Sequence, residues 1–549
     1  MARTPLMQAL LRLASEHAEA SERGISVQEV RDQRRSEISR RDLLKGAGAL
    51  TAALALTDPF NLAGHMFKAN ASSPPRIAVI GGGIAGLNAA LTLHDAGYAS
   101  TIYEASSRLG GRMHSDTTSW ANGQTSEWGG ELIDTRHKTI LQLAKRFGLQ
   151  TVDLLGAQPN SSQDTYFFFG KYYLQKNADS DFQQVHNVLQ GQLQAAPFPT
   201  LYNSYTTSGY QLDHTSVYDW IEQYVTGGHG SNMGQLLDVA YNIEYGRETT
   251  DQSSLNLVYL LGFQPQPGNF RIFGSSDERY HIVGGNQQLP QAIANSLPSG
   301  SINLNWRMTA IVHNSDGSST LTFSTPTGTQ LATFDRVILT LPFSVLRTLD
   351  YSKAGFDSLK QTAITQLGYG TNSKLQLQFD ARYWNGTGTW PGISNGNIYT
   401  DVGFQNTWDV TRGQPGTTGI IVDYTGGNVG ASYKPTGPYS TSSDSLVQQY
   451  AKAFVKQLEE VWPGATSHFT GTATLSYPTG DPNLLGSYAC WRVGQYTLFS
   501  GYEGARQGKI HFAGEHCSIN FQGFMEGGAQ EGNRAANEIL SDYKQGIFP

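Results

Sequence analysis

The hydrophobic pattern after residue 75 alternates between strand-like and helix-like stretches. Residues 76–80 form a short apolar run that predicts a buried strand. Residues 87–97 follow with a helix-like pattern, and residues 101–103 form a second short apolar run. This order of strand, helix and strand predicts a βαβ unit with parallel strands.

A second clear pattern lies near the middle of the chain. Residues 373–379 alternate between apolar and polar side chains, which predicts a half-buried strand. Lys374 lies on the polar face of this strand together with two glutamines. The pattern by itself therefore predicts a lysine in contact with solvent.

A basic and then apolar pattern precedes the folded region. Arg40 and Arg41 come before an apolar stretch at 46–57, which is shorter than the ~20 residues that a membrane span needs. The stretch fits the h-region of a secretory signal, and the paired arginines are typical of the twin-arginine type. Ala69-Asn70-Ala71 offers a cleavage site. We expect bacterial export to the periplasm or the medium and no membrane span.

Length, charge and cysteine content narrow the class of protein. A chain of 549 residues is too long for one simple core, so two to four domains are expected. The net charge of −7 gives no basic surface for nucleic acid. The two cysteines, Cys490 and Cys517, form no metal-ligand spacing, and no metal site is expected. The sequence leaves open whether the chain forms homo-oligomers.

The loop between the first strand and the helix has the form G-x-G-x-x-G. In such a loop the glycines allow a tight turn, a close approach of the pyrophosphate and close packing of helix on strand. The phosphates lie at the helix N-terminus, and an acidic residue after the second strand accepts the ribose hydroxyls. The context predicts dinucleotide binding without separating NAD from FAD. The residues expected at the cofactor are Gly81, Gly83, Ile84, Ala85, Gly86 and Glu104.

The residues after the second strand carry a resemblance to a known family. Residues 104–112 resemble the E-A-x-x-R-x-G-G-R extension of the flavin-containing amine oxidases, which include monoamine, polyamine and L-amino-acid oxidases. Similar motifs follow in order at 128–131, 279–286, 306–308, 334–342, 511–515 and 522–528. The resemblance implies FAD, and it places against FAD the residues Ala105, Gly111, Arg112, Gly129, Gly130, Glu131, Met308, Gly514, Glu515, Gly523, Phe524 and Met525.

The resemblance also implies an α/β architecture with discontinuous domains. Segments 76–137, 277–344 and 486–549 would form a Rossmann-like FAD-binding domain. Segments 138–276 and 345–485 would form an α+β substrate-binding domain with helical insertions. Residues 1–75 would hold an N-terminal helix and the twin-arginine-type signal.

The same resemblance assigns groups beside the flavin. Lys374 matches a lysine that holds a water against the reactive flavin nitrogen, contrary to the solvent-exposed interpretation. Residues 495–497 resemble the segment that carries one aromatic wall, Tyr496, and Phe524 matches the second wall. In monoamine oxidases a cysteine bonded to FAD precedes that tyrosine, and here the residue is Gln495. The resemblance therefore implies non-covalent FAD.

Ordinary core packing remains an alternative for both aromatic residues. Trp408 and Trp491 are further candidates for the substrate pocket, with core packing as an equal alternative.

The substrate depends on one departure from the family pattern. Typical L-amino-acid oxidases carry an arginine for the substrate carboxylate where this chain has Leu132 after Glu131. Another cation is then required, because an unpaired buried carboxylate is costly. The candidates are Arg492, Arg271 and Arg382. Glu131 could instead attract a cationic group of the substrate.

The sequence disfavours two other classes of protein. Residues 392–396 match the G-x-S-x-G motif of hydrolases, but a strand rather than a helix follows, which argues against that class. A flavoprotein that only binds its ligand is disfavoured by Lys374 and the aromatic pair. We expect an FAD-dependent oxidase of an L-amino acid that uses molecular oxygen, with a monoamine or polyamine as the alternative substrate.

Overall fold

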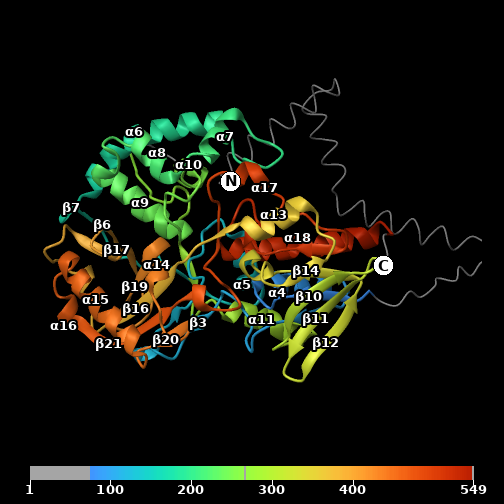
Figure 1. The fold of residues 1–549 in the computed structure, drawn as a ribbon. Helices are drawn as coiled ribbons and strands as arrows, with labels where there is room; N and C mark the ends of the chain where they lie inside the picture. Colours follow the sequence, from blue (N-terminus) through green and yellow to red (C-terminus); the bar gives the residue numbers. More distant parts are fainter. Residues whose placement is uncertain (1–74, 265–267, 547–549) are drawn as a thin grey trace, which may run out of the picture. The chain divides into compact units, whose positions relative to one another are not determined.

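The computed structural model describes residues 75–264 and 268–546. The predicted twin-arginine signal and N-terminal helix lie outside the described residues. Within the described part, no helix is both long and apolar enough to cross a membrane. The fold is α/β, as the sequence predicts (Figure 1).

A parallel sheet forms the core of the cofactor-binding half. Its strand order is β23-β13-β1-β2-β9, and the strands come from the three segments 76–137, 277–344 and 486–549. The domain boundaries themselves stay a prediction. The strands are β1 (Ile77–Ile80), β2 (Thr101–Tyr103), β9 (Ile302–Asn303), β13 (Arg336–Leu339) and β23 (Ile510–Phe512).

The predicted βαβ unit is present. Helix α4 (Ile84–Asp95) connects β1 to β2 and begins three residues before the predicted start. The C-terminal helix α18 (Met525–Lys544) lies alongside α4 (Figure 1). The close approach of the two helices requires glycine at position 532, because a Cβ atom there would lie 2.0 Å from the Ala85 carbonyl oxygen. Helices α5 (Lys138–Arg146) and α11 (Gln288–Ser296) pack beside them.

A smaller sheet has the order β12-β11-β10-β14. Its strands are β10 (Arg307–His313), β11 (Ser319–Thr325), β12 (Gly328–Phe334) and β14 (Asp350–Lys353). Strand β10 carries Met308, one of the residues expected against FAD, and Met308 is buried.

An eight-stranded sheet dominates the other half, with the order β20-β21-β16-β19-β18-β17-β6-β7. Strand β16 (Ser373–Phe379) has the bounds that the sequence predicts. The remaining strands are β6 (Ser162–Phe168), β7 (Lys171–Tyr173), β17 (Ile393–Thr400), β18 (Asn406–Asp409), β19 (Gly419–Thr425), β20 (Tyr439–Thr441) and β21 (Phe469–Ser476).

Both faces of β16 are buried, so the interpretation of its polar face as solvated is wrong. The apolar face packs with helix α15 (Ser445–Val461) in one hydrophobic cluster. On the polar face, the Gln376 amide donates a hydrogen bond to the Glu127 carbonyl oxygen at 3.2 Å. The loop around residues 128–131 therefore covers this face.

A group of helices completes this half (Figure 1). They are α6 (Gln175–Ala195), α7 (Thr207–Asp213), α8 (Val217–Tyr224), α9 (Asn232–Tyr245) and α10 (Ser254–Leu261), with α13 (Ser358–Gln366) and α17 (Gln495–Phe499) packed nearby. Short elements are α12 (Phe343–Leu346), α14 (Gly427–Ser432), α16 (Ala465–His468), β3 (Ser115–Asp116), β4 (Ser126–Glu127), β5 (Thr151–Asp153), β8 (Tyr280–Ile282), β15 (Gly368–Tyr369) and β22 (Ala489–Cys490).

The hydrolase-like motif lies inside a strand. Ser394 is a buried residue of β17, and its hydroxyl oxygen accepts hydrogen bonds from Thr165 and the Gly396 amide. A nucleophile elbow requires an exposed serine between a strand and a helix. The motif is therefore structural here.

Candidate active site

A cavity of about 980 Å³ extends from the loops of the parallel sheet to the eight-stranded sheet. Its volume lies at the upper end of the range for ligand sites, which is about 300–1,000 Å³. All predicted cofactor residues except Gly86 line it. A Cβ atom at Gly86 would lie 2.0 Å from the Gly81 carbonyl oxygen, so this glycine serves helix packing.

The dinucleotide loop forms one end of the cavity. Gly81 has φ +112°, a conformation that favours glycine. Glu104 follows β2, and its carboxylate accepts hydrogen bonds from the Gly82 amide at 2.7 Å and the Ser106 amide at 2.8 Å. These bonds fix the carboxylate between the glycine loop and the E-A-x-x-R-x-G-G-R segment.

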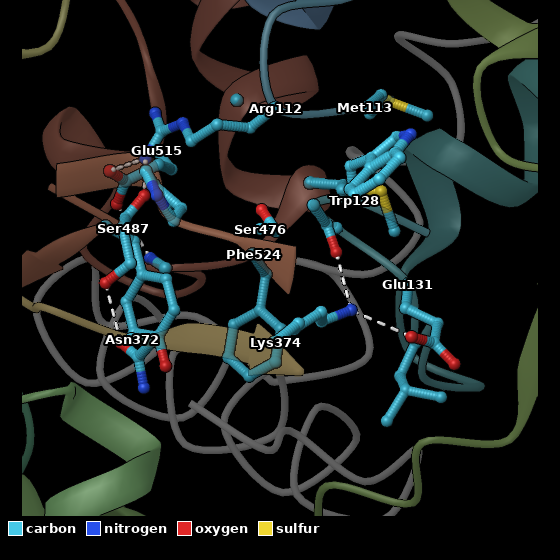
Figure 2. A pocket seen from close by; sticks show the side chains of 18 of the residues that line it. Arg112, Met113, Trp128, Glu131, Asn372, Lys374, Ser476, Ser487, Glu515 and Phe524 are labelled. Atoms are coloured by element: carbon cyan, nitrogen blue, oxygen red, sulfur yellow. Dashed lines mark hydrogen bonds and ion pairs between the residues drawn. The ribbon is translucent and has the colours of Figure 1, made fainter. Parts of the chain in front are cut away.

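An ion pair joins two sequence motifs on the cavity wall. Arg112 lies 2.8 Å from Glu515 (Figure 2). The other oxygen of Glu515 accepts a hydrogen bond from the Gly523 amide at 2.8 Å. Burial is the largest single influence and raises the pKa of the Glu515 carboxyl, but the charge of Arg112 and the hydrogen bonds from Arg112 and the Gly523 amide, among others, together lower it. The pair therefore holds the start of α18 beside the glycine-rich motif.

These residues fit FAD. The N-termini of α4 and α18 both reach the cavity, and such ends stabilise phosphate and other negative groups. A Cβ atom at Gly129 would lie 2.1 Å from the Arg112 carbonyl oxygen, so only glycine lets these two cavity-lining segments pack this closely. Glu104 supplies an acceptor for hydroxyl groups.

Lys374 lies at the meeting point of the two halves. Its ammonium group donates hydrogen bonds to the Gly129 carbonyl oxygen and the Glu131 carboxylate, each at 2.8 Å (Figure 2). It also lies 5.3 Å from the centre of a Trp408 ring. Glu131 thus pairs with a lysine of the protein, and Leu132 and Trp408 line the cavity beside it as predicted.

One row of the eight-stranded sheet forms the floor of this region. Lys374 pairs in register with Tyr424, Tyr424 with Asn406, Asn406 with Tyr399, and Tyr399 with Tyr166. All five side chains line the cavity. Neighbouring strands lie about 4.8 Å apart, so this row continues roughly 19 Å from Lys374. The cavity can therefore hold a substrate beyond the cofactor.

The aromatic walls differ from the prediction. Phe524 lines the cavity, but Tyr496 does not. Tyr496 packs in the core, 4.9 Å from the Trp491 ring, and its hydroxyl donates to the Asn256 side-chain oxygen at 3.0 Å. Trp491 is likewise a core residue outside the cavity, so both pocket assignments are wrong. Tyr488 lines the cavity in their place.

The residue that precedes Tyr488 is Ser487, and it also lines the cavity. Gln495 lies elsewhere, where its side-chain oxygen accepts from the Arg492 amide at 3.0 Å. Cys490 and Cys517 are buried and do not line the cavity. Non-covalent FAD remains a prediction, and it rests on Ser487 instead of Gln495.

Two of the three arginines proposed for a substrate carboxylate lie outside the cavity. Arg492 is 46% exposed and pairs with Asp251 at 2.8 Å. Arg382 donates to the carbonyl oxygens of Thr418 and Gln414. Arg271 lines the cavity and is exposed.

A buried cation of the cavity, Arg412, is not among the residues that the sequence predicts for the site. It is 8% exposed and donates to the Asp409 carbonyl oxygen at 3.1 Å and the Asn397 side-chain oxygen at 3.2 Å. Within the described residues, both of its hydrogen-bond acceptors are neutral groups. No sequence motif contains this arginine. It lies in a loop after a strand, a position that predicts an exposed side chain.

Two carboxyl groups without hydrogen-bond partners in the described residues also line the cavity, Glu244 and Glu278. Burial and the neighbouring Asp134 raise the pKa of Glu278 to about 8, against the effect of Arg412. Burial and the charge of Glu278 hold the pKa of Glu244 well above its ordinary value. A positive charge nearby would stabilise the ionised form of both carboxyl groups.

Residues 84–540 match the family described as flavin containing amine oxidoreductase. The chain belongs to this family. Residues 37–57 match the twin-arginine translocation pathway signal sequence. FAD is therefore the cofactor, and the protein is an amine-oxidising flavoenzyme with an export signal.

Relatives in this family act on different nitrogen compounds. The chain is 26% identical to the putative L-amino-acid oxidase YobN of Bacillus subtilis, over 85% of this chain and 95% of that protein. It is 24% identical to nicotine dehydrogenase of Pseudomonas putida, over 91% and 97%. Its fold is similar to that of cyclohexylamine oxidase of Brevibacterium oxydans, with a TM-score of 0.72, 19% identity and coverage of 86% and 100%.

Proposed function

We propose that this flavoenzyme is an L-amino-acid oxidase. An L-amino acid, oxygen and water would give a 2-oxo acid, ammonia and hydrogen peroxide. FAD, when bound, supplies the two-electron acceptor for the oxidation of the carbon–nitrogen bond. The twin-arginine signal supports a periplasmic or secreted location for this reaction.

Arg412 carries the proposal. Arg412 is buried and makes no salt bridge within the described residues, although the charges of Asp409 and Glu278 act on it at longer range, so a substrate carboxylate would offset the cost of burying its charge. Arginine suits this task because its planar fork can bind a carboxylate through two parallel hydrogen bonds. Arg412 therefore replaces Arg492 as the expected carboxylate partner, in a chain that has Leu132 where typical L-amino-acid oxidases have an arginine.

The remaining residues would position the amine. Tyr488 and Phe524 would form the two aromatic walls that exclude water and orient the nitrogen. Lys374, held by Gly129 and Glu131, would present its ammonium group and a bound water to the cofactor. The imine product would then be hydrolysed to the carbonyl compound and ammonia.

A diamine or polyamine oxidase is the second candidate. Glu244 and Glu278 favour it, because two carboxyl groups that lack hydrogen-bond partners in the described residues would attract a second ammonium group of the substrate. This candidate leaves Arg412 without a role in binding.

A peroxide assay over the L-amino acids, with tyramine and spermidine alongside, separates the two candidates. Arg412→Met should lower kcat/KM for amino acids by about 30-fold or more, since losing one member of a buried charged pair costs 2–5 kcal/mol. Its effect on tyramine should be small, and Arg412→Lys serves as the charge-retaining control. Activity confined to the amines would exclude the amino-acid proposal.

A further inference from the structure

Glu131 contacts both Lys374 and Trp408, and Trp408 lies beside the same lysine. One carboxylate oxygen lies 2.8 Å from the Lys374 ammonium nitrogen (Figure 2). The other accepts a hydrogen bond from the Trp408 indole at 2.9 Å. The Trp408 ring also lies 5.3 Å from the same ammonium nitrogen. The carboxylate is therefore fixed by the two side chains between which it lies.

The pair is buried and electrically balanced. The side chains of Lys374 and Glu131 are 9% and 6% exposed. Burial is the largest single influence and raises the pKa of Glu131, but the charges of Lys374 and His281 and the hydrogen bonds from Lys374 and Trp408 together lower it below the ordinary value. Glu131 is therefore charged, and its charge offsets that of the lysine within a weakly screened interior.

We infer that Glu131 is a positioning residue that acts on bound FAD through Lys374. It holds the ammonium group against the Gly129 carbonyl oxygen and offsets its positive charge at the flavin ring. This inference depends on FAD binding and on a flavin ring that lies beside Gly129 and Gly130, as the resemblance of residues 128–131 to the family motif implies. It does not depend on whether the substrate is an amino acid.

The inference has a direct electrostatic consequence. Reduction of FAD adds negative charge to the ring, so an uncompensated cation nearby favours the reduced state. Glu131→Gln removes the compensating charge and keeps one acceptor oxygen, which can serve the ammonium group while the amide NH2 takes the place of the other oxygen. The midpoint potential of the bound FAD should therefore become more positive.

The test is a double-mutant cycle on the purified holoenzyme. Midpoint potentials are measured by dye equilibration, without substrate, in the wild type, Glu131→Gln, Lys374→Met and the double variant. Glu131→Gln should raise the potential in the presence of Lys374. It should change the potential little in the Lys374→Met background, because an unpaired buried carboxyl group is already neutralised there by protonation.

Two further variants separate charge from structure. Glu131→Asp keeps the charge and should leave the potential closer to the wild-type value than Glu131→Gln does. Glu131→Leu provides a second neutral side chain and should shift the potential in the same direction as Glu131→Gln. FAD content and thermal unfolding are recorded for each variant. An equal shift in both lysine backgrounds, or no shift with Lys374 present, would overturn the inference.

Discussion

The hydroxyl oxygens of Tyr424 and Tyr488 lie 2.9 Å apart in the wall of the cavity. Tyr424 lies on β19 and pairs in register with Lys374. Tyr488 directly follows Ser487, whose carbonyl oxygen accepts a hydrogen bond from Arg112 at 3.0 Å. The Tyr488 hydroxyl also donates to the Glu244 carbonyl oxygen at 2.6 Å. This contact therefore joins the floor of the substrate region, the cofactor side and helix α9.

Replacement of Tyr488 should impair turnover more than replacement of Tyr496. Tyr488→Ala removes an aromatic wall, and we expect kcat/KM to fall about tenfold or more, because the amine loses its orientation and water enters. Tyr488→Phe keeps the ring and should retain most activity. Steady-state kinetics on the best substrate measure both effects.

Tyr496→Phe is the matched control. It removes a buried hydrogen bond to Asn256 and should reduce the free energy of unfolding by about 1–3 kcal/mol, with kcat/KM nearly unchanged. Urea unfolding of the holoenzyme measures this loss. A large loss of kcat/KM in Tyr496→Phe, with Tyr488→Ala unaffected, would restore the original assignment.

Local patterns predicted the fold well where neighbouring residues determine it. The βαβ unit around Gly81–Gly86 and strand β16 follow from apolar runs, glycine spacing and alternation, which are properties of short segments. The burial of Lys374 required the resemblance, because alternation shows which residues share a face and not what covers that face. The cover is the loop around Gly129, from a distant part of the chain.

The errors at the site have a common cause. Tyr488 and Tyr496 are eight residues apart in one segment, and only the tertiary structure separates the cavity wall from the core. Arg412 and Asn397 meet because a loop after β18 folds back towards β17. Such pairings depend on side-chain contacts between strands, which a single sequence does not encode in a local pattern.

FAD should be released when the protein unfolds. Ser487 precedes Tyr488 at the cavity, and burial raises the pKa of the Cys490 thiol to about 12, so that thiol stays protonated. Acid precipitation of the holoenzyme should leave yellow flavin in the supernatant and colourless protein in the pellet. Flavin fluorescence that stays with the protein on a denaturing gel would contradict non-covalent binding.

The ion pair between Arg112 and Glu515 should contribute to FAD retention. Glu515→Gln leaves the half-buried Arg112 without its charged partner and loosens the Gly523 amide at the start of α18. We expect the dissociation constant of FAD to rise about tenfold or more, since breaking a buried pair is costly. Fluorescence titration of the deflavinated protein with FAD measures it.

Arg76→Gln is a matched control for this ion-pair test. Arg76 pairs with Asp335 in an exposed position away from the cavity, so FAD affinity should be unchanged. Equal effects of Glu515→Gln and Arg76→Gln would mean that the variants act through general stability and not through the cofactor site.

Glu278 should make the stability of the enzyme depend on pH. Its pKa is about 8 in the folded protein, above the ordinary 4.5. Between about pH 4.5 and pH 8 the folded state therefore keeps a proton that the unfolded state has lost. Its contribution is therefore fully present below about pH 4.5 and is lost progressively as the pH rises to about 8. Glu278→Gln keeps the neutral form at every pH.

The variant should become increasingly more heat-stable than the wild type from pH 5 to pH 8, with a constant difference above that range. Thermal unfolding of both holoenzymes across pH 5–9 measures the difference in Tm. A cationic substrate that pairs with Glu278 should reduce the difference, because it stabilises the ionised carboxylate of the wild type. A difference in Tm that does not change with pH would show that Glu278 is ionised throughout.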